Sequence, residues 1–348
     1  MNLLEIKNLD IDYVTKEGRL KAVRDVSFTL KQGESIGLVG ESGCGKTTLA
    51  KSIIRLLPEN GVISSGQIIY KGVDIVGKSK EEIRKLRLNE IAMISQSAMN
   101  SLNPVYTVGD QIVEGIRAHS KMSKTEAFKR AEEVFAIIGL EKKRLKSYPH
   151  QMSGGMKQRA IIAMALSLNP SLIIADEPTT ALDVVVQDKI LQQITEIQKE
   201  TNSSMVFITH DISIISELCE TIIVMYGGKI MEKSSTKVFF RQPYHPYSLG
   251  LQNAFPSILE IGGEDLISIP GSPPNLMEDQ EGCRFKDRCP FRTDKCMVDL
   301  PELTNISENH EIACHYHERV KEFREESKKK ETWTMVRDRI IQEGKGGA

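Results

Sequence analysis

The sequence predicts an α/β fold with a sheet core, a helical insert and a loop-rich C-terminal extension. Residues 1 to about 235 alternate short apolar runs with amphipathic stretches, which is typical of strands alternating with helices. Between about 101 and 170 the pattern is wholly helical. From 236 to 348 prolines recur and most of the cysteines cluster. We therefore expect two domains, residues 1–235 and 236–348, with a helical subdomain at about 101–170.

The composition is that of an ordinary globular protein, with 40% hydrophobic and 27% charged residues among 348. A net charge of −1 gives no general attraction to nucleic acid, so we expect no nucleic-acid partner. Residues 1–13 alternate polar and apolar side chains, which favours an edge strand over a targeting signal. The longest apolar stretches, 160–168 and 222–226, are too short to span a bilayer. We therefore expect a cytosolic chain whose membrane role depends on partners.

The first chemical motif follows a short apolar run, Ser35–Val39, that predicts a buried strand. A glycine-rich turn comes next, and a helix is expected to begin near Lys46. The apolar face of this helix is predicted to consist of Leu49, Ile53, Leu56 and Leu57.

The turn between this strand and helix, residues 40–47, matches the pattern G-x-x-x-x-G-K-[ST]. Its glycines allow backbone N–H groups to wrap around phosphates, Lys46 neutralises phosphate charge, and the Thr47 hydroxyl is placed to bind Mg²⁺. A chance glycine turn is the alternative, but the strand and helix on either side favour a phosphate-binding loop. The residues expected to contact nucleotide here are Gly40, Ser42, Gly43, Cys44, Gly45, Lys46, Thr47 and Thr48.

A second apolar strand, predicted at residues 172–175, ends in two carboxylates, Asp176 and Glu177. In an ATPase with a phosphate-binding loop, Asp176 holds Mg²⁺ through water and Glu177 polarises the attacking water as general base. Adjacent carboxylates at a strand end also suit a solvated turn. The phosphate-binding loop in the same chain favours the catalytic interpretation.

Other elements follow from local signals. Residues 205–208 predict a further buried strand, and Tyr-Gly-Gly-Lys at 226–229 predicts a hairpin turn. Ser123 and Glu126 form a capping box that opens a helix. The apolar face of that helix is expected to carry Phe128, Ala131, Val134 and Phe135. The last thirty or so residues are charged and predict a helix.

Residues 152–158, Met-Ser-Gly-Gly-Met-Lys-Gln, are similar to the L-S-G-G-Q signature of ABC transporters. Met152 and Met156 depart from that consensus, and the Ser-Gly-Gly centre is intact. Over about residues 3–235 the chain resembles the ATP-binding subunits of this family, which implies a cassette with a mixed sheet core. The resemblance implies that Ser153, Gly154 and Gly155 bind the γ-phosphate held by a second subunit, and Ser153 is expected to cap a helix there.

Four more positions match the family in order along the chain. The resemblance implies that Gln96 reaches Mg²⁺ and the attacking water, and that Asp183 lies in the loop across the dimer interface. It implies that His210 contacts the γ-phosphate and that Tyr13 stacks on adenine. A lone His, Gln or Tyr is more often structural, so order and spacing support these assignments. Two such cassettes close on two ATP molecules, and residues 97–107 are expected to receive helices of the membrane domains.

The extension holds Cys283, Cys289, Cys296 and Cys314. Their gaps are looser than the close pairs usual in zinc sites, and they suit an iron–sulfur cluster at least as well. Four unrelated cysteines are the alternative. In the cytosol a disulfide framework is not expected.

Residues 244–248, 270–274 and 282–285 resemble the C-terminal extension of dipeptide and oligopeptide importer ATPases. Some of those relatives bind a [4Fe–4S] cluster, so the resemblance implies that the four cysteines are its ligands, with zinc as the lesser alternative. Substitute ligands are available nearby in His310, His315 and His317, for which solvated loop positions are the simpler interpretation.

The expected function is that of an ATPase powering import of dipeptides or oligopeptides, at the cytoplasmic face of the membrane. The expected partners are a second cassette (a paralogue, or an identical chain), two transmembrane permease subunits and an external solute-binding protein. Importers of nickel or other small solutes share the same extension, so the ATPase of such an importer is an alternative function. ABC-type ATPases of DNA repair or translation fit less well, because the former split the cassette around a coiled coil and the latter fuse two cassettes.

Overall fold

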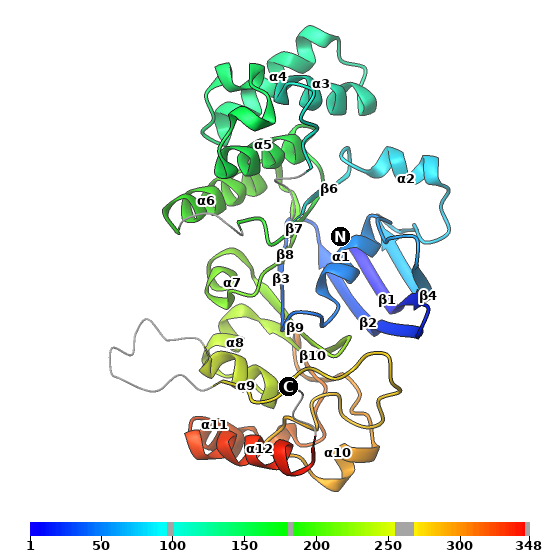
Figure 1. The fold of residues 1–348 in the computed structure, drawn as a ribbon, viewed down its shortest axis with the longest axis vertical. Helices are drawn as coiled ribbons and strands as arrows, with labels where there is room; N and C mark the ends of the chain where they lie inside the picture. Colours follow the sequence, from blue (N-terminus) through cyan, green and yellow to red (C-terminus); the bar gives the residue numbers. More distant parts are fainter. Residues whose placement is uncertain (96–100, 180–183, 255–267, 345–348) are drawn as a thin grey trace.

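The computed structural model describes residues 1–95, 101–179, 184–254 and 268–344. Its centre consists of two sheets (Figure 1). The smaller sheet has the strand order β2-β1-β4-β5. Its strands are β1 (Asn2–Thr15), β2 (Gly18–Lys31), β4 (Gly61–Tyr70) and β5 (Val73–Asp74).

The larger sheet has the order β11-β12-β10-β9-β3-β8-β7-β6. Neighbouring strands from β9 to β6 run parallel, whereas β10, β12 and β11 extend the sheet in antiparallel fashion. The strands are β3 (Ser35–Val39), β6 (Ile91–Ile94), β7 (Leu172–Asp176), β8 (Ser204–Ile208), β9 (Thr221–Tyr226), β10 (Lys229–Ser235), β11 (Thr304–Ser307) and β12 (His310–Ile312). The mixed α/β fold and the hairpin at residues 226–229 are thereby confirmed.

The helices lie on both faces of the larger sheet and at both ends of the molecule (Figure 1). They are α1 (Lys46–Ile53), α2 (Lys80–Leu86), α3 (Val108–His119), α4 (Lys124–Ile137), α5 (Gly154–Leu166), α6 (Val184–Thr201), α7 (Ile212–Leu218), α8 (Thr236–Arg241), α9 (Pro246–Asn253), α10 (Asp294–Val298), α11 (Val320–Ser327) and α12 (Lys330–Gln342). No helix in these parts of the chain combines the length and the apolar character needed to cross a bilayer.

Alternating side chains of β3 divide the interior into two apolar clusters. Ile36 and Leu38 pack with α1 and the smaller sheet, whereas Val39 packs with the cluster on the other face, which includes the helical part. Both faces of β3 are buried, as expected for a strand inside a parallel sheet. The central strand is therefore held rigidly just before the phosphate-binding loop begins.

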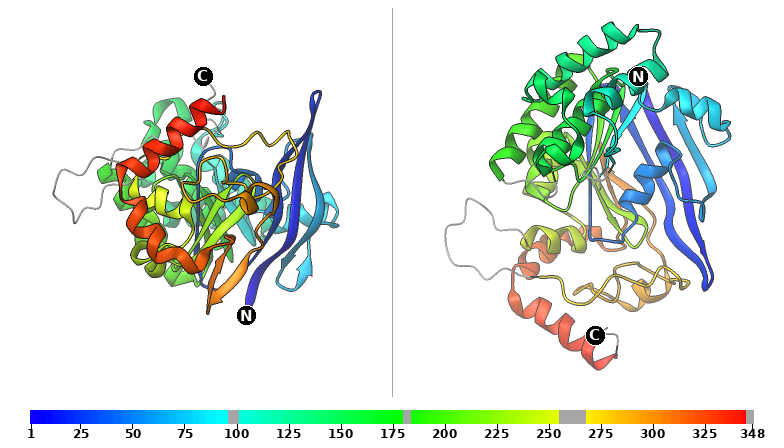
Figure 2. Two further views of the ribbon diagram at one scale, coloured as in Figure 1. Left: turned by 90° about the horizontal axis from the view of Figure 1, so that it is seen from below. Right: turned by 45° about the horizontal axis from the view of Figure 1, so that its top comes forward.

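The predicted helical insert contains α3, α4 and α5, which lie together at one end of the molecule (Figures 1 and 2). The capping box of α4 is confirmed, because Ser123 and Glu126 each accept a hydrogen bond from the other's backbone N–H. Ala131, Val134 and Phe135 are buried on the apolar face of this helix.

The C-terminal extension lies at the opposite end of the molecule (Figures 1 and 2). Its strand β12 pairs with β10, and β11 continues the sheet beyond it. The sequence patterns did not identify β11 and β12, which are short and largely polar. The predicted helical tail is confirmed as α11 and α12, with Trp333 buried and its indole N–H donated to the carbonyl of Ser327.

Two local predictions are wrong. The N-terminal strand β1 is not at an edge, because it pairs with β2 on one side and with β4 on the other. Leu56 does not belong to the apolar face of α1 and is 46% exposed. The helix ends at Ile53, and Arg55 has a φ of 53°, which turns the chain before Leu56.

Candidate nucleotide-binding site

Three functional segments meet at the carboxyl ends of neighbouring strands. The loop at residues 40–47 follows β3. Asp176 ends β7 and Glu177 comes directly after it. His210 follows β8, which lies between those two strands. Because these strands run parallel, their carboxyl ends share one edge of the sheet. The order of the strands therefore brings together residues that are far apart in the sequence.

The loop at residues 40–47 requires glycine where it bends. Gly40 has a φ of 144°, and a Cβ there would lie 2.1 Å from the carbonyl oxygen of Met225. The Lys46 ammonium donates to the carbonyls of Gly40 at 2.7 Å and Glu41 at 2.9 Å, so it lies inside the curve of the loop. The N-terminus of α1 opens at the same place and adds a positive end to the site.

Thr47 and Asp176 come from separate elements and touch. The Thr47 hydroxyl donates to Asp176 Oδ1 at 3.1 Å, and Asp176 is 2% exposed. Burial raises the pKa of Asp176, and the hydrogen bond from Thr47 opposes that rise. A hydroxyl and a carboxylate at this distance are oxygen ligands that suit Mg²⁺.

Glu177 has a φ of 48°, a left-handed conformation that is unusual for a residue with a side chain. Its backbone N–H donates to the carbonyl of Ile208 at 2.9 Å, which fixes this turn against β8. Glu177 Oε1 then lies 3.4 Å from Nδ1 of His210, whose side chain is 72% exposed. The strained turn thus places a carboxylate and an imidazole side by side at the end of the sheet.

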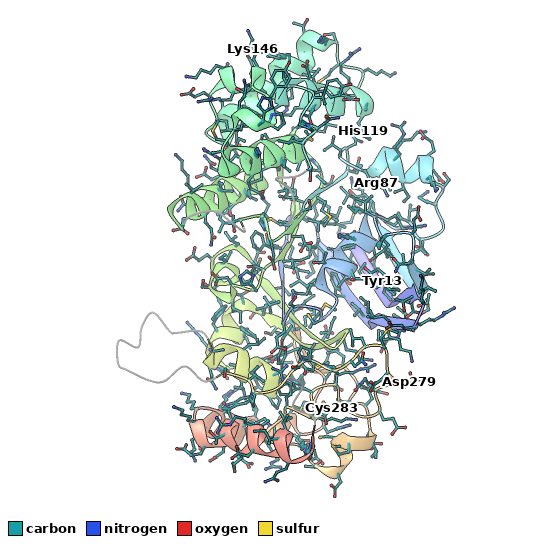
Figure 3. The ribbon with its side chains drawn as sticks, in the orientation of Figure 1. Tyr13, Arg87, His119, Lys146, Asp279 and Cys283 are labelled. Carbon is teal, nitrogen blue, oxygen red and sulfur yellow. The ribbon has the colours of Figure 1, made fainter. Side chains whose placement is uncertain are left out.

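Tyr13 lies on β1 in the lobe formed by the smaller sheet (Figure 3). Its hydroxyl is 3.0 Å from Oγ1 of Thr48 in the first turn of α1. The ring is half-buried beside the start of this helix, next to the phosphate-binding loop.

Ser153 is the exposed N-cap of α5, and its hydroxyl accepts a hydrogen bond from the backbone N–H of Met156. Met152 is buried and Met156 packs against the same apolar cluster, so both departures from the consensus occupy apolar positions. Helix α5 belongs to the helical part of the molecule, whereas α1 lies beside the smaller sheet (Figure 1). Gln96 and Asp183 lie outside the described residues, as do residues 97–100 of the segment 97–107.

The extension brings four cysteines together. Cys283, Cys289, Cys296 and Cys314 line one cavity whose walls include several aromatic rings. Burial raises the pKa of Cys283 to about 11 and that of Cys314 to about 12. In the described parts of the chain, no group of three or more His, Cys, Asp or Glu side chains has the spacing that a single metal ion requires.

The three neighbouring histidines differ from one another. His315 lines the cysteine cavity, and His317 makes a hydrogen bond to the carbonyl of Cys314. The expectation of a solvated loop position is wrong for His310, which is buried on β12 with its Nε2 2.9 Å from the carboxylate of Glu232.

One set of contacts at the phosphate-binding loop was not predicted. Arg288 of the extension makes a two-pronged ion pair with Glu41, a residue inside the loop. The hydroxyl of Tyr247 accepts a hydrogen bond from the backbone N–H of Glu41. Glu41 fills a variable position of the loop motif, and Arg288 is one of several charged residues between Cys283 and Cys296, so no sequence pattern pointed to the pair.

Three family comparisons match this chain. A family described as "ABC transporter" matches residues 23–180, and one described as "P-loop domain" matches 135–254. A third, described as "Oligopeptide/dipeptide transporter, C-terminal region", matches residues 231–296 and thus reaches into the extension.

Curated relatives align over nearly their whole length. The chain is 43% identical to a probable peptide ABC transporter ATP-binding protein of Sinorhizobium fredii, over 90% of this chain and 94% of the relative. It is 43% identical to the oligopeptide transport ATP-binding protein OppD of Escherichia coli, over 90% of this chain and 92% of the relative. The same identity and the same share of this chain apply to the dipeptide transport ATP-binding protein DppD of Bacillus subtilis, of which 94% is covered.

Solved structures of ATP-binding cassettes match about two thirds of the chain. The dimeric ATP-binding cassette MJ0796, in a post-hydrolysis state bound to ADP and Pi, has a TM-score of 0.61 and 30% identity. It covers 67% of this chain, and 98% of the MJ0796 cassette is covered in turn.

Proposed function

The chain belongs to the family of ABC transporter ATP-binding proteins, and from that premise we propose that it powers import of dipeptides or oligopeptides across the cytoplasmic membrane. The observation that carries the proposal is the union, in one chain, of the nucleotide site and an extension that matches oligopeptide and dipeptide transporters. Relatives named for peptide, oligopeptide and dipeptide transport align across both parts. ATP hydrolysis is the reaction of this family.

For hydrolysis, we propose that the loop around Lys46 cradles the phosphates of ATP and that Thr47 and Asp176 hold Mg²⁺. The metal supplies positive charge where charge develops on the transferring phosphoryl group. Glu177 accepts a proton from the attacking water as general base. His210, 3.4 Å from Glu177, orients that carboxylate and approaches the γ-phosphate.

The remaining site residues complete this proposal. We propose that Tyr13 stacks on adenine, because its ring lies beside Thr48 and the start of α1. Gln96 and Asp183 stay predictions for the water and for the dimer interface. Ser153 opens a helix in a different part of the molecule from the phosphate-binding loop, which supports a role in the site of a second cassette.

The proposed assembly follows from the same relatives. Two cassettes, this chain and a paralogue or a second copy, close on two ATP molecules. They work at the cytoplasmic face of the membrane, on two permease subunits served by an external solute-binding protein. The described part of the segment after Gln96 includes Val105 and Tyr106, which are 72% and 55% exposed. Exposed apolar side chains there support a contact with permease helices.

We further propose that Cys283, Cys289, Cys296 and Cys314 hold a [4Fe–4S] cluster, with zinc as the lesser alternative. Support comes from the four free thiols that line one cavity. A cluster there would tie the loops of the extension to one another. We expect roughly four irons per chain, with matching sulfide, in protein purified without oxygen. One zinc without iron would replace the cluster, and metal-free wild-type protein would sink the proposal.

The import function is tested in cells that lack this chain. Uptake of a labelled dipeptide and a labelled oligopeptide should disappear and return with the wild-type chain. It should not return with Lys46→Ala, which removes the phosphate-binding ammonium. Rescue of nickel uptake, with peptide uptake unaffected throughout, would replace peptides by nickel as the cargo.

A further inference from the structure

The structure contains a direct mechanical connection between the cysteine loop and the phosphate-binding loop. Its centre is Arg288, which is 3% exposed and immediately precedes Cys289. The guanidinium donates to both carboxylate oxygens of Glu41, at 2.6 and 2.9 Å. A two-pronged arginine–carboxylate pair fixes orientation as well as distance.

The guanidinium has no spare hydrogen-bonding capacity. Besides the two bonds to Glu41, it donates to the hydroxyl of Tyr226 and to the carbonyls of Ile269 and Pro270. These bonds use all five N–H donors of the side chain. Burial by itself lowers the pKa of Arg288, but the bonds to Glu41 and Tyr226 outweigh it and raise the pKa. The guanidinium of Arg288 is therefore charged, and its five hydrogen bonds hold it in one position.

Glu41 is held on its backbone as well as its side chain. Its N–H donates to the hydroxyl of Tyr247 at 2.9 Å, and its carbonyl accepts from the Lys46 ammonium at 2.9 Å. The residue that Arg288 grips is thus the residue that helps to position the phosphate-binding lysine. The rings of Tyr226 and Tyr247 pack against each other in a tilted arrangement, with centroids 4.7 Å apart and an interplanar angle of 58°.

The other end of the connection is equally fixed. The backbone N–H of Arg288 donates to the carbonyl of Phe285, whose ring packs on Tyr226 and helps to line the cysteine cavity. The carbonyl of Cys289 accepts a hydrogen bond from Arg339 of α12. A rearrangement of the cysteine loop therefore displaces Arg288, and with it Glu41.

We infer that Arg288 is a positioning residue through which the state of the cysteine loop and the binding of nucleotide influence each other. The inference rests on the proposed nucleotide site, and it requires no particular metal in the cavity. Coupling between two sites is reciprocal, so nucleotide must also stabilise the cysteine loop. Coupling free energies of this kind usually correspond to a change of about 5–150-fold in affinity.

The first test measures the affinity of the full-length chain for MgADP by calorimetry. Arg288→Gln should weaken binding about tenfold, and Arg288→Lys should fall in between, because an ammonium cannot form the two-pronged pair. The matched control is Arg292→Gln, in the same loop as Arg288. This change breaks an ion pair with Glu343 at the end of α12, and the variant should bind MgADP as tightly as wild type. In a double-mutant cycle, Arg288→Gln with Glu41→Gln should lose no more than the stronger single change.

The second test measures the rate at which a thiol reagent labels the four extension cysteines, read peptide by peptide to separate them from Cys44. MgADP should slow this labelling in the wild-type chain and in Arg292→Gln, but not in Arg288→Gln. Melting curves of the same variants show whether the substitution acts only on stability.

Three results would overturn the inference. These are wild-type MgADP affinity in Arg288→Gln, losses that add in the cycle with Glu41→Gln, and equal protection of the thiols in Arg288→Gln and wild type. A lower melting temperature with unchanged MgADP affinity would make Arg288 merely structural. If the wild-type chain itself fails to bind MgADP, the proposed ATPase function falls together with the coupling.

Discussion

A buried carboxylate joins the extension to the rest of the fold, and its removal has a calculable cost. Glu232 on β10 is 0% exposed. It accepts hydrogen bonds from the backbone N–H groups of Tyr244 at 3.0 Å and His245 at 2.8 Å, and it lies 2.9 Å from Nε2 of His310 on β12. One side chain thus connects β10, the turn before α9 and the added strand.

Glu232→Ala leaves two backbone donors and an imidazole without their acceptor. A buried donor that loses its partner costs about 1–3 kcal/mol, and breaking a buried pair on one side costs about 3–5 kcal/mol. We expect a loss of about 3–5 kcal/mol in the free energy of unfolding. At about 2 °C per kcal/mol, the melting temperature should fall by roughly 6–10 °C. Glu232→Gln keeps the volume and one acceptor oxygen, so we expect only about 1–2 kcal/mol.

The fluorescence of Trp333 is a suitable readout, because it is the single tryptophan of the chain and is buried in α12 of the extension. Urea or thermal unfolding followed at this residue reports on the region that Glu232 supports. The matched control is Glu311→Gln, which breaks a partly exposed pair with Lys233 between the same two strands. Such pairs contribute about 0–1 kcal/mol. If Glu232→Ala costs no more than this control, the reasoning about the buried network is wrong.

Three further predictions concern catalysis and local stability. Glu177→Gln should lower ATP hydrolysis about 10²–10⁴-fold while nucleotide binding is retained, as measured by phosphate release and by calorimetry. Ser153→Ala should leave nucleotide binding by the isolated chain unchanged but slow hydrolysis in the assembled transporter, and equal loss in both assays would contradict a role in the partner's site. Ser123→Ala removes the capping hydrogen bond to Glu126 and should cost about 1 kcal/mol in unfolding free energy, without any effect on MgADP affinity.

Local signals explain why the candidate nucleotide site could be proposed from the sequence. A buried strand, a glycine turn and a helix follow one another over residues 35–53, so neighbouring residues alone determine the geometry of the loop. Asp176 and Thr47 are 129 positions apart, yet each ends or begins an element whose place in a parallel sheet follows from its pattern. Because both side chains carry oxygen atoms that suit Mg²⁺, we expect them to lie close together.

The missed features depend on contacts that have no local signal. Glu41 and Arg288 are 247 positions apart, and neither belongs to a periodic pattern or to a fixed motif position. β12 covers only residues 310–312, too few for an alternation to be recognised. The error on β1 has the same origin, because its second partner is β4, which follows β2, β3 and α1 in the chain. Such pairings are decided by the tertiary fold and not by propensity.

These contacts make the C-terminal extension a structural part of the domain that precedes it. β12 continues the sheet whose strands carry the candidate nucleotide site. The hydrogen-bond partners of Glu232 on β10 come from Tyr244, His245 and His310. Arg288 forms an ion pair with Glu41, a residue inside the phosphate-binding loop. Removing residues 236–348 would therefore uncover an edge of the main sheet, a buried carboxylate and the back of the nucleotide site at once. We therefore expect the C-terminal segment to support the nucleotide site as well as the sheet. A chain truncated after residue 235 should lose nucleotide affinity as well as stability.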